Sequence, residues 1–137
     1  MHLAAVNYIR AHNGRCEVYI PPFGVYLFED DSTYLEPDMI VVCDPSRLEE
    51  KGCIGAPDWV VEIISPSSVK MDIGKKLFKY REAGVREYWV IWPEKRMVTV
   101  YLFNKDEEKE SAAIYPFEEE IPCFVIEGLK IRLADHL

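Results

Sequence analysis

The sequence contains no long apolar run. None of its hydrophobic stretches approaches the roughly 18 residues that a membrane-spanning helix requires. The N-terminal segment turns polar after Val6, and no small-residue cleavage site follows an apolar stretch as it would in a signal peptide. We therefore expect a protein that does not enter the membrane and that is cytoplasmic.

Closely spaced cysteines are also missing. Cys16, Cys43, Cys53 and Cys123 form no Cys-x-x-Cys pair, which argues against a zinc site. Two disulfides could form, but without a secretion signal we expect reduced thiols, with Cys43 and Cys123 as small core residues.

Positive charge is scarce. The chain has 16 Lys and Arg against 24 Asp and Glu, a formal net charge of −8. A passive nucleic-acid coat needs a basic surface, so this class is excluded. An enzyme with a local basic cleft remains possible, and an acidic site that recruits a divalent metal would itself add negative charge.

What the sequence does have suits one folded domain. Its 137 residues, 49% of them hydrophobic, are enough for a single core and are not typical of a disordered chain. No internal repeat or low-complexity tract divides it. We expect one domain over residues 1–137.

Hydrophobic periodicity and turn residues predict two helices among several strands. Residues 44–57 are rich in turn formers and are predicted to be a loop, and the tail is expected to add short strands at a sheet edge. The predicted elements are a helix at 2–12, strands at 16–20, 24–28, 37–43 and 59–64, a helix at 69–83, and strands at 87–92 and 97–103. Residues 59–92 thus form a βαβ unit with a right-handed crossover and parallel strands. The fold class is α/β, with a mixed sheet flanked by helices.

Two carboxylates interrupt apolar strands. Side chains alternate along a strand, so Asp38 shares a face with Ile40, and Glu62 shares a face with Val60. If the strands are neighbours, Asp38 and Glu62 converge, and a divalent cation would relieve their repulsion. The alternative for Glu62 is a structural acid satisfied by an Arg, a Lys or a backbone N–H.

The helix at 69–83 carries three lysines that are not equivalent. Its apolar stripe consists of Ile73, Leu77 and Tyr80. At about 100° per residue, Lys76 borders this stripe and can reach toward Glu62, whereas Lys75 and Lys79 project toward solvent. The alternative is an ordinary surface pair between Asp72 and Lys76.

These features resemble a known family. Pro37-Asp38, an acid in an apolar strand and then a lysine resemble the PD-(D/E)XK nuclease superfamily. The segment "APDWVVEIISPSSVKMDIGKKLFKYREAGVREYWVIWPE" is similar to the core of the Uma-two family of putative restriction endonucleases, and the match is close over residues 35–95. The resemblance implies a restriction-endonuclease-like fold. Family members usually begin with further residues, so we expect the N-terminal part to be shortened.

The resemblance also implies a metal site. Asp38 and Glu62 match the two metal-binding acids of the family. Together with the backbone carbonyl of Ile63, they would hold Mg²⁺ or Mn²⁺. No small-molecule cofactor is implied.

The resemblance places the catalytic lysine on the helix. Nucleases of this superfamily usually carry it two residues after the second acid, where this chain has Ile64. Lys76 is the matching residue, with Asp72 and Tyr80 in supporting roles. The implied activity is Mg²⁺-dependent hydrolysis of DNA phosphodiester bonds.

Two other functions stay open. One is a catalytically inactive nuclease-fold module that acts in an assembly or in regulation. The other is a metal phosphohydrolase that acts on nucleotides. We also expect a homodimer, because the chain has more aromatic side chains than one small core needs. Those expected at the interface are Trp89 or Trp92, with Tyr101 and Phe103.

Overall fold

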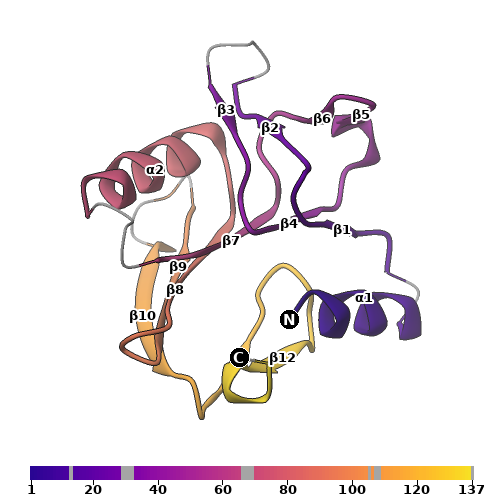
Figure 1. The fold of residues 1–137 in the computed structure, drawn as a ribbon. Coiled ribbons are helices and arrows are strands. Elements are labelled where there is room, and N and C mark those ends of the chain that lie inside the picture. The colour runs from indigo at the N-terminus through magenta and orange to yellow at the C-terminus, as the bar shows by residue number, and fades with distance from the viewer. Residues whose placement is uncertain (13, 29–32, 66–69, 105, 107–108, 137) are drawn as a thin grey trace.

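The computed structural model describes the whole chain except residues 13, 29–32, 66–69, 105, 107–108 and 137 (Figure 1). For residues 2 and 70–72, which lie in helices, only the backbone is described.

A six-stranded mixed sheet forms the centre of the fold. Its strands stand in the order β1-β4-β7-β8-β9-β10. They are β1 (Glu17–Tyr19), β4 (Met39–Val42), β7 (Trp59–Ile63), β8 (Glu87–Trp92), β9 (Met97–Leu102) and β10 (Ser111–Pro116). Only β7 and β8 pair in parallel within this sheet; the other neighbours are antiparallel. The predicted mixed sheet is therefore confirmed, as are the parallel strands of the βαβ unit.

Two helices and the C-terminal segment cover the sheet on opposite faces. Helix α2 (Lys70–Ala83) connects β7 to β8 and places Tyr80 on the face that carries Ile40, Val60 and Val90. The other face packs against α1 (His2–Ala11) and against the chain after β10 (Figure 1). Because both faces of β4, β7 and β8 are buried, these strands read as nearly continuous apolar runs.

The predicted loop at 44–57 was wrong. It contains the 3-10 turn η1 (Pro45–Arg47) and the strands β5 (Leu48–Glu49) and β6 (Gly52–Ile54). These strands join β2 (Val25–Tyr26) and β3 (Tyr34–Leu35) in a small second sheet of order β3-β2-β6-β5. Strands of two or three residues are too short to show a period, and they form here because β6 pairs with β2.

The tail differs partly from the prediction. Strand β10 does lie at the edge of the central sheet. Strands β11 (Glu120–Pro122) and β12 (Lys130–Arg132) instead form a separate two-stranded ribbon, followed by the 3-10 turn η3 (Leu133–Asp135). Ile121, Ile131 and Leu133 from this region complete the core below the sheet.

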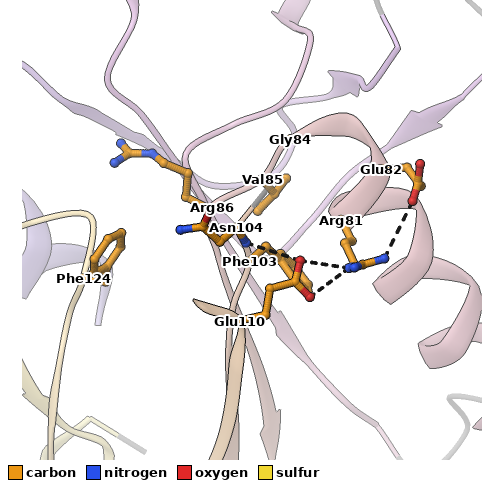
Figure 2. A pocket seen from close by; sticks show the side chains of 9 residues that line it. All are labelled: Arg81, Glu82, Gly84, Val85, Arg86, Phe103, Asn104, Glu110 and Phe124. Atoms are coloured by element: carbon orange, nitrogen blue, oxygen red, sulfur yellow. Dashed lines mark hydrogen bonds and ion pairs between the residues drawn. The ribbon is translucent and has the colours of Figure 1, made fainter. Parts of the chain in front are cut away.

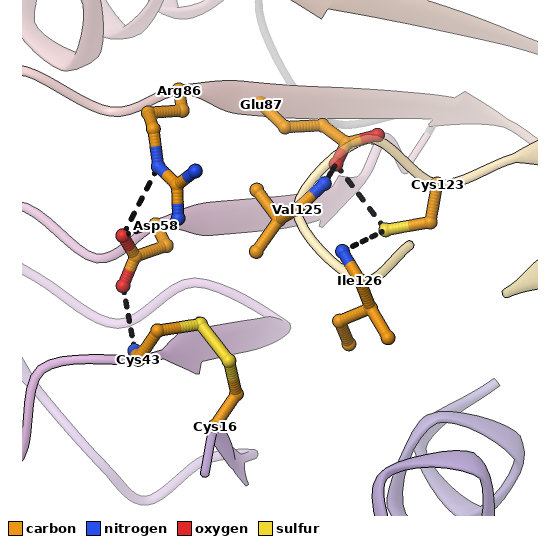
Figure 3. The surroundings of a disulfide bond; sticks show 8 residues. All are labelled: Cys16, Cys43, Asp58, Arg86, Glu87, Cys123, Val125 and Ile126. Atoms are coloured by element: carbon orange, nitrogen blue, oxygen red, sulfur yellow. Dashed lines mark hydrogen bonds and ion pairs between the residues drawn. A yellow bond between two sulfur atoms is a disulfide. The ribbon is translucent and has the colours of Figure 1, made fainter. Parts of the chain in front are cut away.

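Two of the four cysteines form a disulfide, contrary to the prediction of reduced thiols. Cys16 and Cys43 are bonded, with Cα atoms 4.0 Å apart (Figure 3). The reason lies in the β1–β4 register. Glu17 stands opposite Val42, so the next pair outward is Cys16 opposite Cys43. Cys53 and Cys123 are free and buried, which agrees with a core role for Cys123.

The aromatic residues expected at an interface are divided between core and surface. Trp89 is fully buried, so of the two tryptophans only Trp92 stays a candidate for an interface. Trp92 is partly buried and donates its indole N–H to Thr99 Oγ1 at 3.2 Å. Tyr101 and Phe103 are also partly buried and pack against the cluster beneath α2.

In the part of the chain that the structure describes, no helix is long and apolar enough to cross a membrane.

Candidate functional site

Asp38 and Glu62 lie at the same end of two neighbouring strands. In the antiparallel pairing of β4 with β7, Met39 stands opposite Val61 and Ile40 opposite Val60. One step further along the same register, Asp38 stands opposite Glu62. The Ile63 backbone N–H donates to Asp38 Oδ2 at 2.7 Å, which fixes the Asp38 carboxylate beside the end of β7.

Glu62 is buried, with 5% of its surface exposed, and three donors satisfy its carboxylate. Lys76 Nζ lies 3.2 Å from Oε1, and the Tyr80 hydroxyl donates to the same oxygen at 3.1 Å. The Tyr88 hydroxyl donates to Oε2 at 3.0 Å. A buried carboxylate without such partners would be strongly unfavourable, so these three side chains explain how an acid can stand within an apolar strand.

Helix α2 directs one lysine toward the carboxylates. Tyr80 is fully buried, and Lys76 lies beside it with 31% of its side chain exposed. Lys75 is exposed, as predicted, whereas Lys79 is partly buried and does not project fully into solvent. The side chain of Asp72 lies outside the described residues, and with it the alternative interpretation, a surface pair between Asp72 and Lys76.

The predicted metal ligands and Lys76 border a small pocket of about 90 Å³. It is lined by Glu36, Asp38, Glu62, Ile63, Ile64, Ile73 and Lys76. Pockets for organic ligands usually measure about 300–1,000 Å³, so this one suits an ion and a few waters better than an organic cofactor. Its polar lining consists of three carboxylates and one ammonium group.

Glu36 is a lining residue that the sequence interpretation missed. It is exposed, and its Oε1 accepts a hydrogen bond from the Tyr34 hydroxyl at 2.7 Å. The available signal was its position two residues before Asp38, which is compatible with the same side of an extended chain. A single glutamate just ahead of a Pro-Asp pair gave no reason to prefer it to the other acids nearby.

The donor set fits a hard divalent cation. Asp38, Glu62 and the Ile63 carbonyl offer only oxygen ligands, and Mg²⁺ is commonly bound by one or two carboxylates with waters and substrate phosphates. Among the described residues, no group of three or more His, Cys, Asp or Glu side chains is placed to hold a metal.

The two tyrosines that contact Glu62 are permanent donors near neutral pH. Burial raises the pKa of Tyr80 and of Tyr88 well above the usual value of 10.0, and the negative charge of Glu62 raises both further. Both hydroxyls therefore keep their protons and remain available to the carboxylate.

A larger pocket lies elsewhere, near the C-terminal end of α2 (Figure 2). It has a volume of about 570 Å³ and is lined by Arg81, Glu82, Gly84, Val85, Arg86, Phe103, Asn104, Glu110 and Phe124. Its two guanidinium groups are already in ion pairs: Arg81 with Glu110 at 3.0 Å, and Arg86 with Asp58 at 2.9 Å. The convergent carboxylates and lysine make the smaller pocket the better candidate site.

A second buried acid, Glu87, has a structural environment. It is fully buried on the opposite face of the sheet from Glu62. Its carboxylate accepts the backbone N–H groups of Phe124 and Val125 at 3.0–3.2 Å and the Trp89 indole N–H at 2.8 Å. Figure 3 shows the contact with Val125. It thereby holds the loop between β11 and β12 against β8.

Comparisons with known proteins identify a family and a similar fold. A family model named Uma2, described as "Putative restriction endonuclease", matches residues 2–134. The crystal structure of a putative nuclease belonging to DUF820 from Anabaena variabilis is similar in fold, with a TM-score of 0.69 and 23% sequence identity. That match covers 98% of this chain and 78% of the other. No curated protein matches the sequence.

Proposed function

The chain belongs to the Uma2 family of putative restriction endonucleases, and on this premise we propose that it hydrolyses DNA phosphodiester bonds with Mg²⁺ or Mn²⁺. The observation that carries the proposal is the convergence of Asp38, Glu62 and Lys76 on one small pocket. Two acids at the ends of neighbouring inner strands, with a lysine beside them, are groups that can serve metal-assisted phosphodiester hydrolysis.

Asp38 and Glu62 would hold the metal, with the backbone carbonyl of Ile63 as a further ligand. When bound, such a metal lowers the pKa of a coordinated water and offsets negative charge on the phosphate. The Ile63 N–H keeps the Asp38 carboxylate in place through the 2.7 Å hydrogen bond. The protein thus aligns both acids through the backbone of β7.

Lys76 would act on the phosphate. Its ammonium group pairs with Glu62 in this structure, at 3.2 Å, and its side chain is partly exposed to the pocket. A long, flexible lysine can turn from that carboxylate toward a phosphate oxygen and stabilise the negative charge that grows in the transition state. Tyr80 would support Glu62, and Asp72 would support the lysine from the same helix.

Nicking of a supercoiled plasmid tests this proposal. We expect the wild-type protein to nick DNA with Mg²⁺ or Mn²⁺ and to stop when EDTA is added. Asp38→Asn and Glu62→Gln should abolish nicking, whereas the control Glu94→Gln, an exposed acid in the β8–β9 turn, should not.

The same assay separates the alternatives. Cleavage of small phosphodiesters but not of plasmid would favour a nucleotide phosphohydrolase. An absence of both cleavage and Mn²⁺ binding in the wild-type protein would contradict the proposal and favour a non-catalytic module, a role with which the net charge of −8 is compatible.

We further propose that the protein forms a homodimer, since a twofold arrangement suits cleavage of both DNA strands. Large apolar side chains on the surface support this: Phe78 is 63% exposed, Ile114 on the edge strand β10 is 64% exposed, and Phe124 is 59% exposed. We expect light scattering to give twice the chain mass at a protein concentration of roughly tens of micromolar, a working range that suits modest interfaces. A monomeric mass there would rule the dimer out.

A further inference from the structure

We infer that Tyr88, together with Tyr80, is a positioning residue that aims the Glu62 carboxylate into the pocket. This inference rests on the proposed function of that site. It starts from the donors to Glu62: one is the exchangeable ammonium group of Lys76, and the other two are buried phenols.

The two phenols come from different elements. Tyr80 lies on α2 and Tyr88 on β8, and both side chains are fully buried. Their rings contact each other with centroids 4.9 Å apart and planes tilted by 55°. Tyr88 also stacks on Tyr101 of β9, with centroids 6.0 Å apart. These contacts leave each hydroxyl little freedom except to point at Glu62.

The hydrogen bonds assign different tasks to the phenols and to the lysine. An ionised carboxylate has about four acceptor positions. Three are filled here: Oε1 accepts from Lys76 and Tyr80, and Oε2 accepts from Tyr88. One position therefore remains for a cation even before Lys76 leaves. The phenols are buried and therefore fix the orientation of the carboxylate. The lysine is partly exposed and can leave the carboxylate for another partner.

A carboxylate held in this way is preorganised for a cation. Outer partners that orient a metal ligand are typically worth 10- to 100-fold in metal affinity or activity. Glu62 without Tyr88 would keep its place in the strand but would lose the only donor on Oε2 among the described residues. Its side chain could then turn, and the binding geometry would be populated for only part of the time.

A Mn²⁺ titration of the full chain tests the inference without measuring catalysis. Binding is monitored by calorimetry or by the electron paramagnetic resonance signal of free Mn²⁺. We expect Tyr88→Phe to weaken Mn²⁺ binding by about 10-fold or more while the circular dichroism spectrum keeps its native form. Tyr101→Phe is the matched control, because it removes a hydroxyl from the stacked neighbour that does not donate to Glu62. Its Mn²⁺ affinity should equal that of the wild type.

A second variant and a double variant make the result specific. Tyr80→Phe removes the other phenol from a different element and should also weaken Mn²⁺ binding, which keeps the inference testable if Tyr88→Phe does not fold. If Glu62→Gln retains measurable Mn²⁺ affinity, Tyr88→Phe in that background should cause no further loss, because its effect passes through the carboxylate. A further loss there would overturn the inference.

The outcomes distinguish this inference from the proposed function. The wild type could bind Mn²⁺ and both Tyr88→Phe and Tyr80→Phe could bind it with the same affinity. That result would overturn the positioning role but would support the metal site. An absence of Mn²⁺ binding in the wild type would overturn the proposed function, and the positioning role with it.

Discussion

Glu62 and Glu87 are buried acids on adjacent parallel strands, yet they face opposite sides of the sheet. Side chains donate to Glu62, and one of them, Lys76, is partly exposed. Two backbone N–H groups, one indole N–H and the Cys123 thiol donate to Glu87, and none of these described partners is a charged side chain. An acid in an apolar strand is therefore not sufficient to indicate a functional site. The partly exposed lysine partner distinguishes Glu62 from the structural acid Glu87.

We predict that Lys76→Ala lowers any Mg²⁺-dependent nicking by about 10²-fold or more, the scale of removing one electrostatic donor from a transition state. Turnover should fall more than DNA binding, because the lysine acts on charge that develops during the reaction. Plasmid nicking and filter binding, measured on the same preparation, provide the two quantities.

Lys75→Ala is the matched control. Lys75 precedes Lys76 on the same helix and is exposed, so its loss should leave nicking nearly unchanged. Equal losses in the two variants would indicate a general effect on DNA attraction and would contradict a specific role for Lys76.

We predict that Glu87→Gln lowers the free energy of unfolding by about 2–5 kcal/mol. The amide replaces one acceptor oxygen with a donor, so at least one buried N–H group loses its partner, and such a loss costs about 1–3 kcal/mol beyond the charge-assisted bond itself. Urea denaturation measures the change. Glu94→Gln, an exposed glutamate, should lie within about 0.5 kcal/mol of the wild type.

The sequence predicted only some of the residues at the site. Asp38, Glu62 and Lys76 were found because strand alternation, helical angle and family resemblance converge on them. Tyr88 was missed because a tyrosine within an apolar strand reads as core, and nothing in the local pattern shows what its hydroxyl meets across the sheet. Contacts between elements are not encoded in the period of either element.

At the scale of elements, the length of each element decided how well it was predicted. Strand β8 and helix α2 were predicted to within a residue because each has several turns or alternations, bounded by turn residues. Strands β5 and β6 have two and three residues, and they exist only through pairing with each other and with β2. Such strands carry no periodic signal of their own.

The disulfide links two elements in a way that can be measured. It closes a loop with a sequence separation of 27 residues between the end of β4 and the start of β1. The chain-entropy model gives about 3.5 kcal/mol for a loop of this length, within the usual range of about 2–4 kcal/mol. We predict that reduction lowers the free energy of unfolding by about that amount.

Urea denaturation with and without a phosphine reductant checks this prediction. Cys16→Ser should remove the response to the reductant, because no disulfide is then available to be cleaved. Titration of the unfolded, unreduced wild type should detect two thiols, those of Cys53 and Cys123. Detection of four thiols would contradict the bond.

At the scale of the whole molecule, buried thiols make the free energy of unfolding depend on pH in the alkaline range. Burial raises the pKa of the Cys53 thiol from 9.0 to about 11. Burial also raises the pKa of Cys123, and the nearby Glu87 raises it further. Well below pH 9 both thiols are protonated whether the chain is folded or unfolded, so they contribute no pH dependence there.

We predict that the free energy of unfolding falls as pH rises above about 9. The unfolded chain then loses thiol protons that the folded chain retains, and each such thiol contributes a slope of at most about 1.4 kcal/mol per pH unit. The urea midpoint, followed from pH 8 to about 10.5 without added thiol, measures this fall. Cys53→Ala should make the slope shallower, whereas an unchanged slope would contradict the assignment to Cys53.

The central sheet was predicted more fully than the layer of α1 and the C-terminal segment that covers one of its faces. The mixed sheet and its βαβ unit follow from long periodic segments. The packing of the ribbon β11–β12 and of α1 against the underside of the sheet was not predicted, because it depends on contacts between the two ends of the chain. Apolar residues spread through the tail are compatible with an edge strand and with a covering ribbon alike.

The pairing of Asp38 with Glu62 has a consequence for how sequences of this kind can diverge. A strand that gains or loses one residue turns its remaining side chains to the other face. A single-residue insertion within β4 or β7 would therefore separate the two acids, whereas an insertion in the connection between them, at 44–57, would leave their register intact. Natural variation in length should thus accumulate between these strands and be purged from within them.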